Sequence, residues 1–349
     1  MVVTVKRRTP IWRATLLVLG SLAFTFSVLE IAFRFIVPRA SETDMYVRSD
    51  DELLNVELRP GSDFEFEGVA VKIPATRVAT SSRGLREREL SVPKPSGVLR
   101  IGCLGDSFTF GWGVEVHETW CRVLEERLGS VGGRRVETVN LGVPGYNPSQ
   151  QVRFLQKKGL DLGLEVVVTF FDATDYDPPI RHPDPSEIGP WLVDHSALFR
   201  WIFLRTNHQG IGDEGGDEGG DSEGTGSKET RDPAGEVLSA YSLLADLSRK
   251  HGFDVLMTMF MPEERDRQVG ARIEALGLPV VGLTTGVLLG QRGFHDAPPC
   301  ERVADEQALF IPLDGHLSVL GNRQAACVIA SALRQIHHQR FPAGSVSRE

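Results

Sequence analysis

Residues 98–114 read VLRIGCLGDSFTFGWGV, and this stretch decides the fold. The run from Val98 to Leu104 is rich in apolar residues and ends at Gly105, which is typical of a strand covered on both faces. Ser107 follows almost at once, so its hydroxyl is expected at the turn from this strand into a helix. Strands buried on both faces belong to parallel sheets with crossover helices, and the stretch therefore predicts an α/β domain.

The chain beyond this stretch alternates in the same way. Further strands are expected at 136–141, 164–171, 253–261 and 278–283, and helices at 118–128, from Pro148 onward, and at 237–249, 263–276 and 319–338. Five strand-helix units predict a doubly wound, mainly parallel five-stranded sheet. In such sheets ligands bind at the carboxyl ends of the strands, so the residues that follow each strand are the candidates for function.

The N-terminal residues differ from all that follow. Four basic residues before position 14 precede an uncharged apolar run from Ala14 to Leu29, and the apolar character continues to Val37 around Glu30 and Arg34. Counted to Val37, the run is long enough for a membrane span of about 20 residues. Glu30 and Arg34 lie one helical turn apart near its end, where they can pair or extend to the interface.

No A-x-A pattern of small residues follows the apolar run, which favours an uncleaved membrane anchor over a removed signal peptide. A buried core helix is the third interpretation. Basic residues precede the run and acidic residues follow it, so the N-terminus is expected in the cytoplasm and the rest of the chain on the extracytoplasmic, periplasmic side. The predicted organisation is an anchor over 1–39, a lead-in segment over 40–95, the α/β domain over 96–340 and a tail over 341–349.

Composition excludes several classes of protein. The chain has 349 residues, of which 41% are hydrophobic and 24% charged, so it is neither wholly disordered nor a polytopic membrane protein. Its net charge of −9 disfavours a nucleic-acid partner. Six of those charges come from residues 210–232, where eight acidic residues face two basic ones, so the α/β domain itself is close to neutral.

The segment 210–232 is Gly-rich and nearly free of apolar side chains, and a disordered loop is expected there. Its acidic residues lack the spacing of a calcium loop. The four cysteines contain no CxxC pair, which indicates neither a zinc site nor a disulfide scaffold, although a pairing of Cys300 with Cys327 stays open. No cofactor and no metal is expected.

Polar residues follow three of the predicted strands. Ser107 follows the first, the glycine-containing NLGVPGY of residues 140–146 follows the second, and FDATD of residues 171–175 follows the third. Near the C-terminus, Asp314 stands two residues before His316, where a carboxylate can orient an imidazole as the base for a serine nucleophile. Taken singly, Ser107 fits a helix cap and His316 a surface residue. The stretch matches neither the G-x-S-x-G elbow nor a dinucleotide or Walker loop.

Together these segments resemble the SGNH, or GDSL-type, hydrolase superfamily over roughly residues 80–337. The resemblance implies a flavodoxin-like fold, Ser107 as nucleophile, His316 as base and Asp314 as its partner. It implies an oxyanion hole built from the backbone N–H groups of Ser107 and Gly145. The Asp-x-His spacing is similar to that of the alginate O-acetylation branch, and residues 80–86, TSSRGLR, are similar to a segment of membrane-anchored members.

The third block departs from the family pattern. Thr174 stands where the family has an oxyanion-hole Asn, while Asp175 matches the family's Asp and is expected to brace the turn. A Thr hydroxyl can donate one hydrogen bond in place of the carboxamide, or its presence can mark weakened catalysis. Loss of one donor costs about 10² to 10³ in turnover.

The resemblance implies a membrane-anchored, extracytoplasmic serine esterase or O-acyl transferase whose partner is an ester substrate, an acylated polysaccharide or lipid. The alternatives are a catalytically weak or silent SGNH-fold subunit that binds carbohydrate or assists assembly in an envelope polysaccharide system, and a cytoplasmic lipase whose apolar N-terminus is a core helix.

Overall fold

The computed structural model describes residues 11–36, 45–66, 73–179, 192, 195–206, 231–260, 264–283, 285–288, 300–336 and 341. The chain divides into two compact units. One unit comprises Met1–Thr43 and Asp184–Gly216, and the other comprises Asp44–Pro183 and Asp217–Glu349. The loop predicted over 210–232, except for its last two residues, and the tail predicted over 341–349, except for Phe341, lie outside the described residues.

The smaller unit contains the long N-terminal helix. Helix α1 (Ile11–Ile36) carries an apolar stretch, Trp12–Phe35, that is long and hydrophobic enough to cross a membrane, with a mean hydropathy of 2.1. A signal sequence would have the same properties. A second helix, α7 (Ala197–Thr206), belongs to the same unit, contacts α1 and was not predicted.

The larger unit is built on a six-stranded sheet in the order β10-β9-β8-β5-β7-β6. Its strands are β5 (Val98–Gly105), β6 (Ser130–Val131), β7 (Arg134–Gly142), β8 (Val166–Phe171), β9 (Asp254–Met259) and β10 (Val280–Gly282). All neighbours pair in parallel except β6, which is antiparallel to β7. The five predicted parallel strands are confirmed. The expected number of strands was wrong by one, because a two-residue edge strand carries no periodicity that a sequence can reveal.

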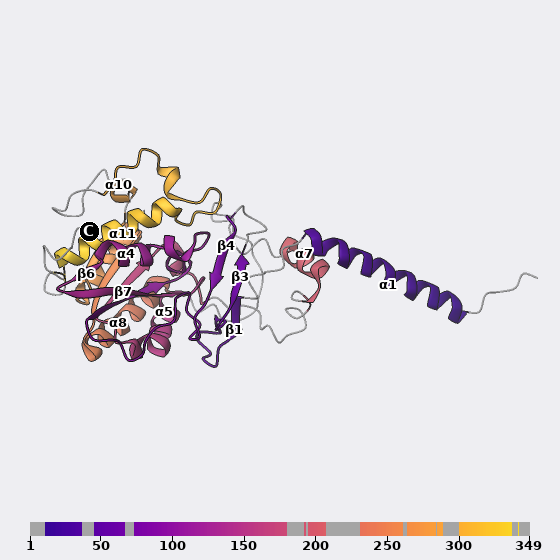
Figure 1. Cartoon of the computed structure of the whole chain (residues 1–349), viewed down its shortest axis with the longest axis horizontal. Coiled ribbons are helices and arrows are strands. Elements are labelled where there is room, and N and C mark those ends of the chain that lie inside the picture. Colours follow the sequence, from indigo (N-terminus) through magenta and orange to yellow (C-terminus); the bar gives the residue numbers. More distant parts are fainter. Residues whose placement is uncertain are drawn as a thin grey trace, which may run out of the picture. The chain divides into compact units, whose positions relative to one another are not determined.

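Helices cover both faces of the sheet, so the doubly wound arrangement is confirmed (Figure 1). They are α3 (Ser107–Phe110), α4 (Trp120–Leu128), α5 (Pro148–Phe154), α8 (Pro233–His251), α9 (Glu264–Ala275), α10 (Thr285–Leu288) and α11 (Val319–Ile336), with short turns η1 (Val116–Glu118), η2 (Leu155–Gly159), η3 (Leu160–Leu162), η4 (Ala173–Tyr176) and η5 (Glu306–Leu309). Helices α4 and α11 pack together on one face, and α5 and α8 on the other.

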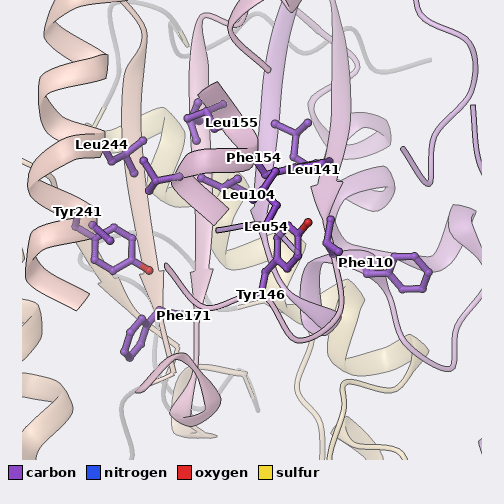
Figure 2. Close-up of a cluster of buried hydrophobic side chains, with 14 of the residues drawn as sticks. Leu54, Leu104, Phe110, Leu141, Tyr146, Phe154, Leu155, Phe171, Tyr241 and Leu244 are labelled. Carbon is purple, nitrogen blue, oxygen red and sulfur yellow. The ribbon is translucent and has the colours of Figure 1, made fainter. Parts of the chain in front are cut away.

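The core on the α5 and α8 face joins residues that are distant in the chain. Leu104 and Leu141 at the ends of β5 and β7 share one buried cluster with Phe154 of α5 and Leu244 of α8 (Figure 2). Leu54, which precedes the sheet by more than 40 residues of sequence, is fully buried in the same cluster. Part of the lead-in segment therefore contributes to the core of the larger unit.

The lead-in segment forms two antiparallel hairpins. Strands β1 (Tyr46–Arg48) and β2 (Val56–Leu58) form the first, and β3 (Asp63–Phe66) and β4 (Thr76–Ala79) the second. The Tyr146 hydroxyl, just after β7, donates to the carbonyl of Val56. This bond fixes the first hairpin beside the carboxyl end of the sheet.

All four cysteines form disulfides, Cys103–Cys121 and Cys300–Cys327. The second is the pairing that the sequence left open. The first joins β5 to α4, and the expectation that the cysteines form no disulfide framework was wrong. Cys103 lies within an apolar strand and Cys121 within an amphipathic helix, and only the packing of that helix on that strand brings them together.

Candidate active site

Ser107 lies at the turn from β5 into α3, as expected for a side chain at the carboxyl end of a central parallel strand. Asp106 caps the short helix by accepting a hydrogen bond of 3.0 Å from the N–H of Phe108. Gly142 of β7 runs alongside this turn, and a Cβ there would collide with backbone atoms of the turn. Glycine at position 142 therefore lets the second strand end approach the serine turn.

His316 reaches Ser107 from the C-terminal part of the chain. Its Nε2 lies 2.7 Å from Ser107 Oγ, and its Nδ1 lies 2.6 Å from Asp314 Oδ1. An ionised carboxylate only accepts hydrogen bonds, so Nδ1 carries the proton and Nε2 is left to accept from the serine hydroxyl. The three residues that the sequence predicted are thus brought together. His316 lies between Ser107 and Asp314, as general-base catalysis requires.

A tight turn presents both Asp314 and His316. Leu313 and Gly315 adopt positive φ values of 67° and 88°, and the turn is closed by a hydrogen bond from the N–H of Ile311 to the carbonyl of His316. Asp314 also accepts from the N–H of His316 at 3.2 Å. The Asp314 side chain is nearly buried and the His316 side chain is partly exposed, so a carboxyl group shielded from water holds the imidazole.

Two backbone N–H groups are available to stabilise a developing oxyanion. Within the described residues, neither the N–H of Ser107 nor that of Gly145 donates a hydrogen bond. Gly145 has a φ of 79°, a conformation that glycine adopts without steric cost. Unpaired donors at the turns after β5 and β7 are what an oxyanion hole requires.

Thr174 lies in η4, directly after β8. Its hydroxyl is 2.6 Å from Asp172 Oδ1 and 3.2 Å from Asp106 Oδ2, and its N–H donates to Asp172 Oδ1 at 2.7 Å. The single hydroxyl proton is therefore directed at a carboxyl group in this geometry. The role of Thr174 as a third oxyanion donor stays a prediction.

Three buried carboxyl groups surround this turn. Asp106, Asp172 and Asp175 are each less than 5% exposed. Burial raises the pKa of Asp172, and burial together with the charge of Asp172 raises the pKa values of Asp106 and Asp175 well above the usual range. At least one of them keeps its proton at pH values where an exposed aspartate is ionised. The sequence did not identify Asp172, because the hydrophobic pattern does not show that a polar residue directly after a strand is buried.

Asp175 braces the turn, as expected. Its carboxylate accepts a 3.0 Å hydrogen bond from the N–H of Asp172 and one of 2.7 Å from the Gln151 side chain. These contacts tie the end of β8 to α5. No hydrogen bond joins Asp175 to Ser107 or His316 in the described part of the chain.

Arg86 of the lead-in segment hydrogen-bonds to the backbone at the end of α3, the short helix that begins at Ser107. Its guanidinium is fully buried, donates to the carbonyls of Phe110 and Gly111 at 3.0 and 2.6 Å, and also donates to those of Arg77 and Val114. It stacks on the Phe110 ring at 4.7 Å. Burial lowers its pKa to about 10, so it stays charged at neutral pH. The sequence had placed Arg86 only within a resembling segment.

No family model and no curated protein matches this sequence. Among solved structures, a lipolytic protein of the G-D-S-L family from Desulfitobacterium hafniense aligns with 12% identity over 67% of this chain and 99% of its own, at a TM-score of 0.39. A lipase/acylhydrolase from Enterococcus faecalis aligns with 14% identity over 68% and 96%, at 0.38. A psychrotrophic esterase from Pseudoalteromonas sp. aligns with 8% identity over 68% and 98%, at 0.41. Over about two thirds of its length, this chain therefore aligns with a G-D-S-L family lipolytic protein, a lipase/acylhydrolase and an esterase.

Proposed function

We propose that the chain is an ester hydrolase of the SGNH superfamily that works through an acyl-serine intermediate. The observation that carries the proposal is the relay from Ser107 Oγ to His316 Nε2 at 2.7 Å and from His316 Nδ1 to Asp314 at 2.6 Å. Both distances lie within the reach that general-base catalysis needs. The three residues also occupy the positions that the resembling sequence blocks assign to nucleophile, base and orienting acid.

In the proposed reaction, the Ser107 oxygen attacks the ester carbonyl while its proton moves to His316 Nε2. Asp314 stabilises the imidazolium that forms. The tetrahedral oxyanion is held by the N–H groups of Ser107 and Gly145, with Thr174 as the candidate third donor. The imidazolium then gives its proton to the departing alcohol, and the acyl group stays on the serine.

Water or a sugar hydroxyl completes the cycle. The neutral imidazole takes a proton from the acceptor, whose oxygen attacks the acyl-serine carbonyl, and the serine hydroxyl is restored. With water the products are a carboxylic acid and the free enzyme, and with a sugar hydroxyl the product is a new ester. We propose an acyl ester of a polysaccharide or lipid as the substrate class, with hydrolysis or acyl transfer decided by which acceptor reaches the acyl-serine.

We propose that α1 anchors the enzyme in a membrane, with the N-terminus in the cytoplasm and the α/β domain outside. The apolar stretch Trp12–Phe35 and the basic residues before it support this orientation. The two disulfides support an oxidising compartment for the domain.

One observation favours a second candidate, an SGNH-fold subunit with weak or no catalysis that binds carbohydrate or assists assembly in an envelope polysaccharide system. The Thr174 hydroxyl bonds to the carboxyl groups of Asp172 and Asp106, so it offers no proton to a substrate in this geometry. If this donor is not replaced, turnover is lower by about 10² to 10³.

Hydrolysis of p-nitrophenyl acetate by the full-length protein in detergent tests the proposal. Ser107→Ala is expected to abolish turnover and labelling by a fluorophosphonate probe, because the nucleophile is gone. Ser239→Ala, which removes an exposed serine of α8, serves as the control and should leave both unchanged. Equal rates for the wild type and Ser107→Ala, with no labelling of either, would instead support the silent subunit.

A further inference from the structure

Glu30 places a carboxylate within the apolar stretch of α1. An ionised group at the edge of the hydrocarbon region of a bilayer is costly unless it is paired. Arg34, one turn further along α1, pairs with Glu30 at 3.1 Å, but its own side chain is largely exposed. The Glu30 side chain is far less exposed, which means that other groups cover it.

The groups that cover Glu30 belong to the start of α7. Ser196 Oγ donates to Glu30 at 2.8 Å, and the N–H groups of Ala197 and Leu198 donate at 3.0 and 3.3 Å. The first N–H groups of a helix have no partners within it, and an anion there is favoured by the helix dipole. Glu30 therefore acts as an external cap for α7, contributed by another helix.

A second contact fixes the two helices one turn further along. The rings of Phe33 on α1 and Trp201 on α7 lie 4.9 Å apart between centroids. Both contacts lie near the carboxyl end of α1, and α7 lies against that end (Figure 1).

Because α7 begins beside Glu30, the position of Glu30 along α1 determines how deep in a bilayer α7 would begin. The 24 residues of Trp12–Phe35 span ~36 Å at 1.5 Å per residue, against a hydrocarbon core of about 30 Å. With Trp12 at one boundary, the other boundary falls about one turn before Phe35. Glu30 and the start of α7 then lie where acyl chains meet headgroups.

The composition of α7 fits that location. Its sequence is ALFRWIFLRT, and the side chains of Phe199 and Ile202 are 37% and 41% exposed. Phe and Trp side chains on a short helix with arginines are typical of helices that lie in the membrane interface. In water these apolar side chains would be exposed beside α1, whose own apolar stretch is not buried in the structure.

We propose that α7 is a second membrane-contacting element, which lies in the boundary between acyl chains and headgroups of the leaflet where the carboxyl end of α1 emerges. Its partner is the lipid surface. The inference rests on the proposed anchoring of α1 and is independent of the ester chemistry. It assigns to α7 a role in holding the protein at the membrane surface.

A fluorescent probe on α7 tests the proposal in the full-length chain. Ile202→Cys is labelled with nitrobenzoxadiazole and reconstituted into vesicles of phosphatidylethanolamine and phosphatidylglycerol. The expected result is blue-shifted emission, quenching by nitroxide-labelled lipid and protection from aqueous dithionite. The control is the same label at Leu243→Cys on α8, which is equally exposed at 41% and should behave as in water. All native cysteines are in disulfides, so the label is directed to the new residue.

The possible outcomes distinguish the proposal that α1 is an anchor from the proposal that α7 contacts the membrane. A protein that fails to float with the vesicles refutes both proposals. A protein that floats with a water-exposed label at position 202 refutes the α7 proposal alone. A disulfide between two copies of the unlabelled Ile202→Cys variant, formed on oxidation, assigns that face to a second chain instead of lipid. In a Phe33→Cys, Trp201→Cys variant, the expected cross-link should be lost when Glu30→Ala is added and kept with Glu30→Gln, which still accepts a hydrogen bond. Equal cross-linking with Glu30→Ala would contradict the capping role.

Discussion

Ser107 and His316 are 209 positions apart in the chain and meet through one hydrogen bond of 2.7 Å. At this scale the sequence identified Ser107, His316 and Asp314, which the structure joins through two hydrogen bonds. It was uninformative about Thr174, because the direction in which a hydroxyl donates depends on Asp172, whose inward position only the fold determines.

Replacing Thr174 with Asn is expected to raise the turnover of p-nitrophenyl acetate by roughly tenfold or more, since one restored oxyanion donor is worth up to ~10² to 10³. A carboxamide carries two N–H donors and is longer, so it can bond to Asp172 and still reach the oxyanion. The measurement is kcat at fixed pH.

Thr174→Val is the companion variant for this experiment. It removes the hydroxyl and keeps the shape, and turnover should change little because the proton is already directed at Asp172. A fall comparable to the loss of an oxyanion donor would show that Thr174 itself donates to the substrate.

At the scale of elements, strands and helices were predicted well because each is long enough to show its period. The exceptions are elements that are too short to show a period or that are stabilised by residues distant in the chain. Strand β6 is two residues long, and α7 depends on a cap that Glu30 supplies from 166 residues away. The lead-in hairpins are short, and only their buried contacts show that they belong to the core.

Arg86 links the lead-in segment to the serine turn, so Arg86→Lys tests whether that segment positions Ser107, the proposed nucleophile. A lysine cannot satisfy four carbonyls in a forked arrangement, and each buried carbonyl left unpaired costs about 1 to 3 kcal/mol. The variant should unfold at lower urea concentration and show a lower kcat with little change in KM.

The control for Arg86 is Arg77→Lys. Arg77 pairs with Asp63 on the surface, where a lysine can replace it and water screens the pair. Its unfolding midpoint and kcat should match those of the wild type. Equal unfolding midpoints and equal kcat values for the two variants would show that Arg86 does not position the serine turn.

The acidic residues around η4 give the folded protein a dependence on pH. Burial raises the pKa values of Asp106, Asp172 and Asp175 above those of the unfolded chain, so the folded state favours their protonated forms. Their contribution to stability is therefore complete below the ordinary pKa of aspartate and is lost as pH rises through the raised values.

Urea unfolding at a series of pH values measures this effect. Asp172→Asn removes one of the three acids and should make the decline of the unfolding free energy with rising pH shallower. Asp246→Asn on the exposed face of α8 is the control and should leave the slope unchanged. Identical slopes for wild type and Asp172→Asn would contradict the assignment.

At the scale of the whole molecule, two disulfides cross-link the larger unit. One joins β5 to α4, and the other joins Cys300 to α11. They join residues 18 and 27 positions apart, and closing loops of this length stabilises a fold by about 3 kcal/mol each. The sequence could not reveal the pairing of Cys103, because partners are chosen by packing and not by spacing.

Reduction should therefore lower the thermal unfolding midpoint of the wild type. The double variant Cys103→Ala, Cys121→Ala is expected to unfold at a lower temperature and to respond less to reductant, since one of the two bonds is already absent. An unfolding midpoint that reductant does not change would show that these disulfides do not contribute to stability in solution.

The turn that carries Asp314 and His316 has a further consequence. Because Asp314 and His316 lie on one short turn, a displacement of the turn moves them together and alters only the distance to Ser107. The bond of 2.6 Å between them should produce a strongly downfield imidazole proton resonance in the NMR spectrum, and that resonance should persist in Ser107→Ala. The protein would then carry an internal reporter of His316, which can be observed without substrate and in the absence of the Ser107 hydroxyl.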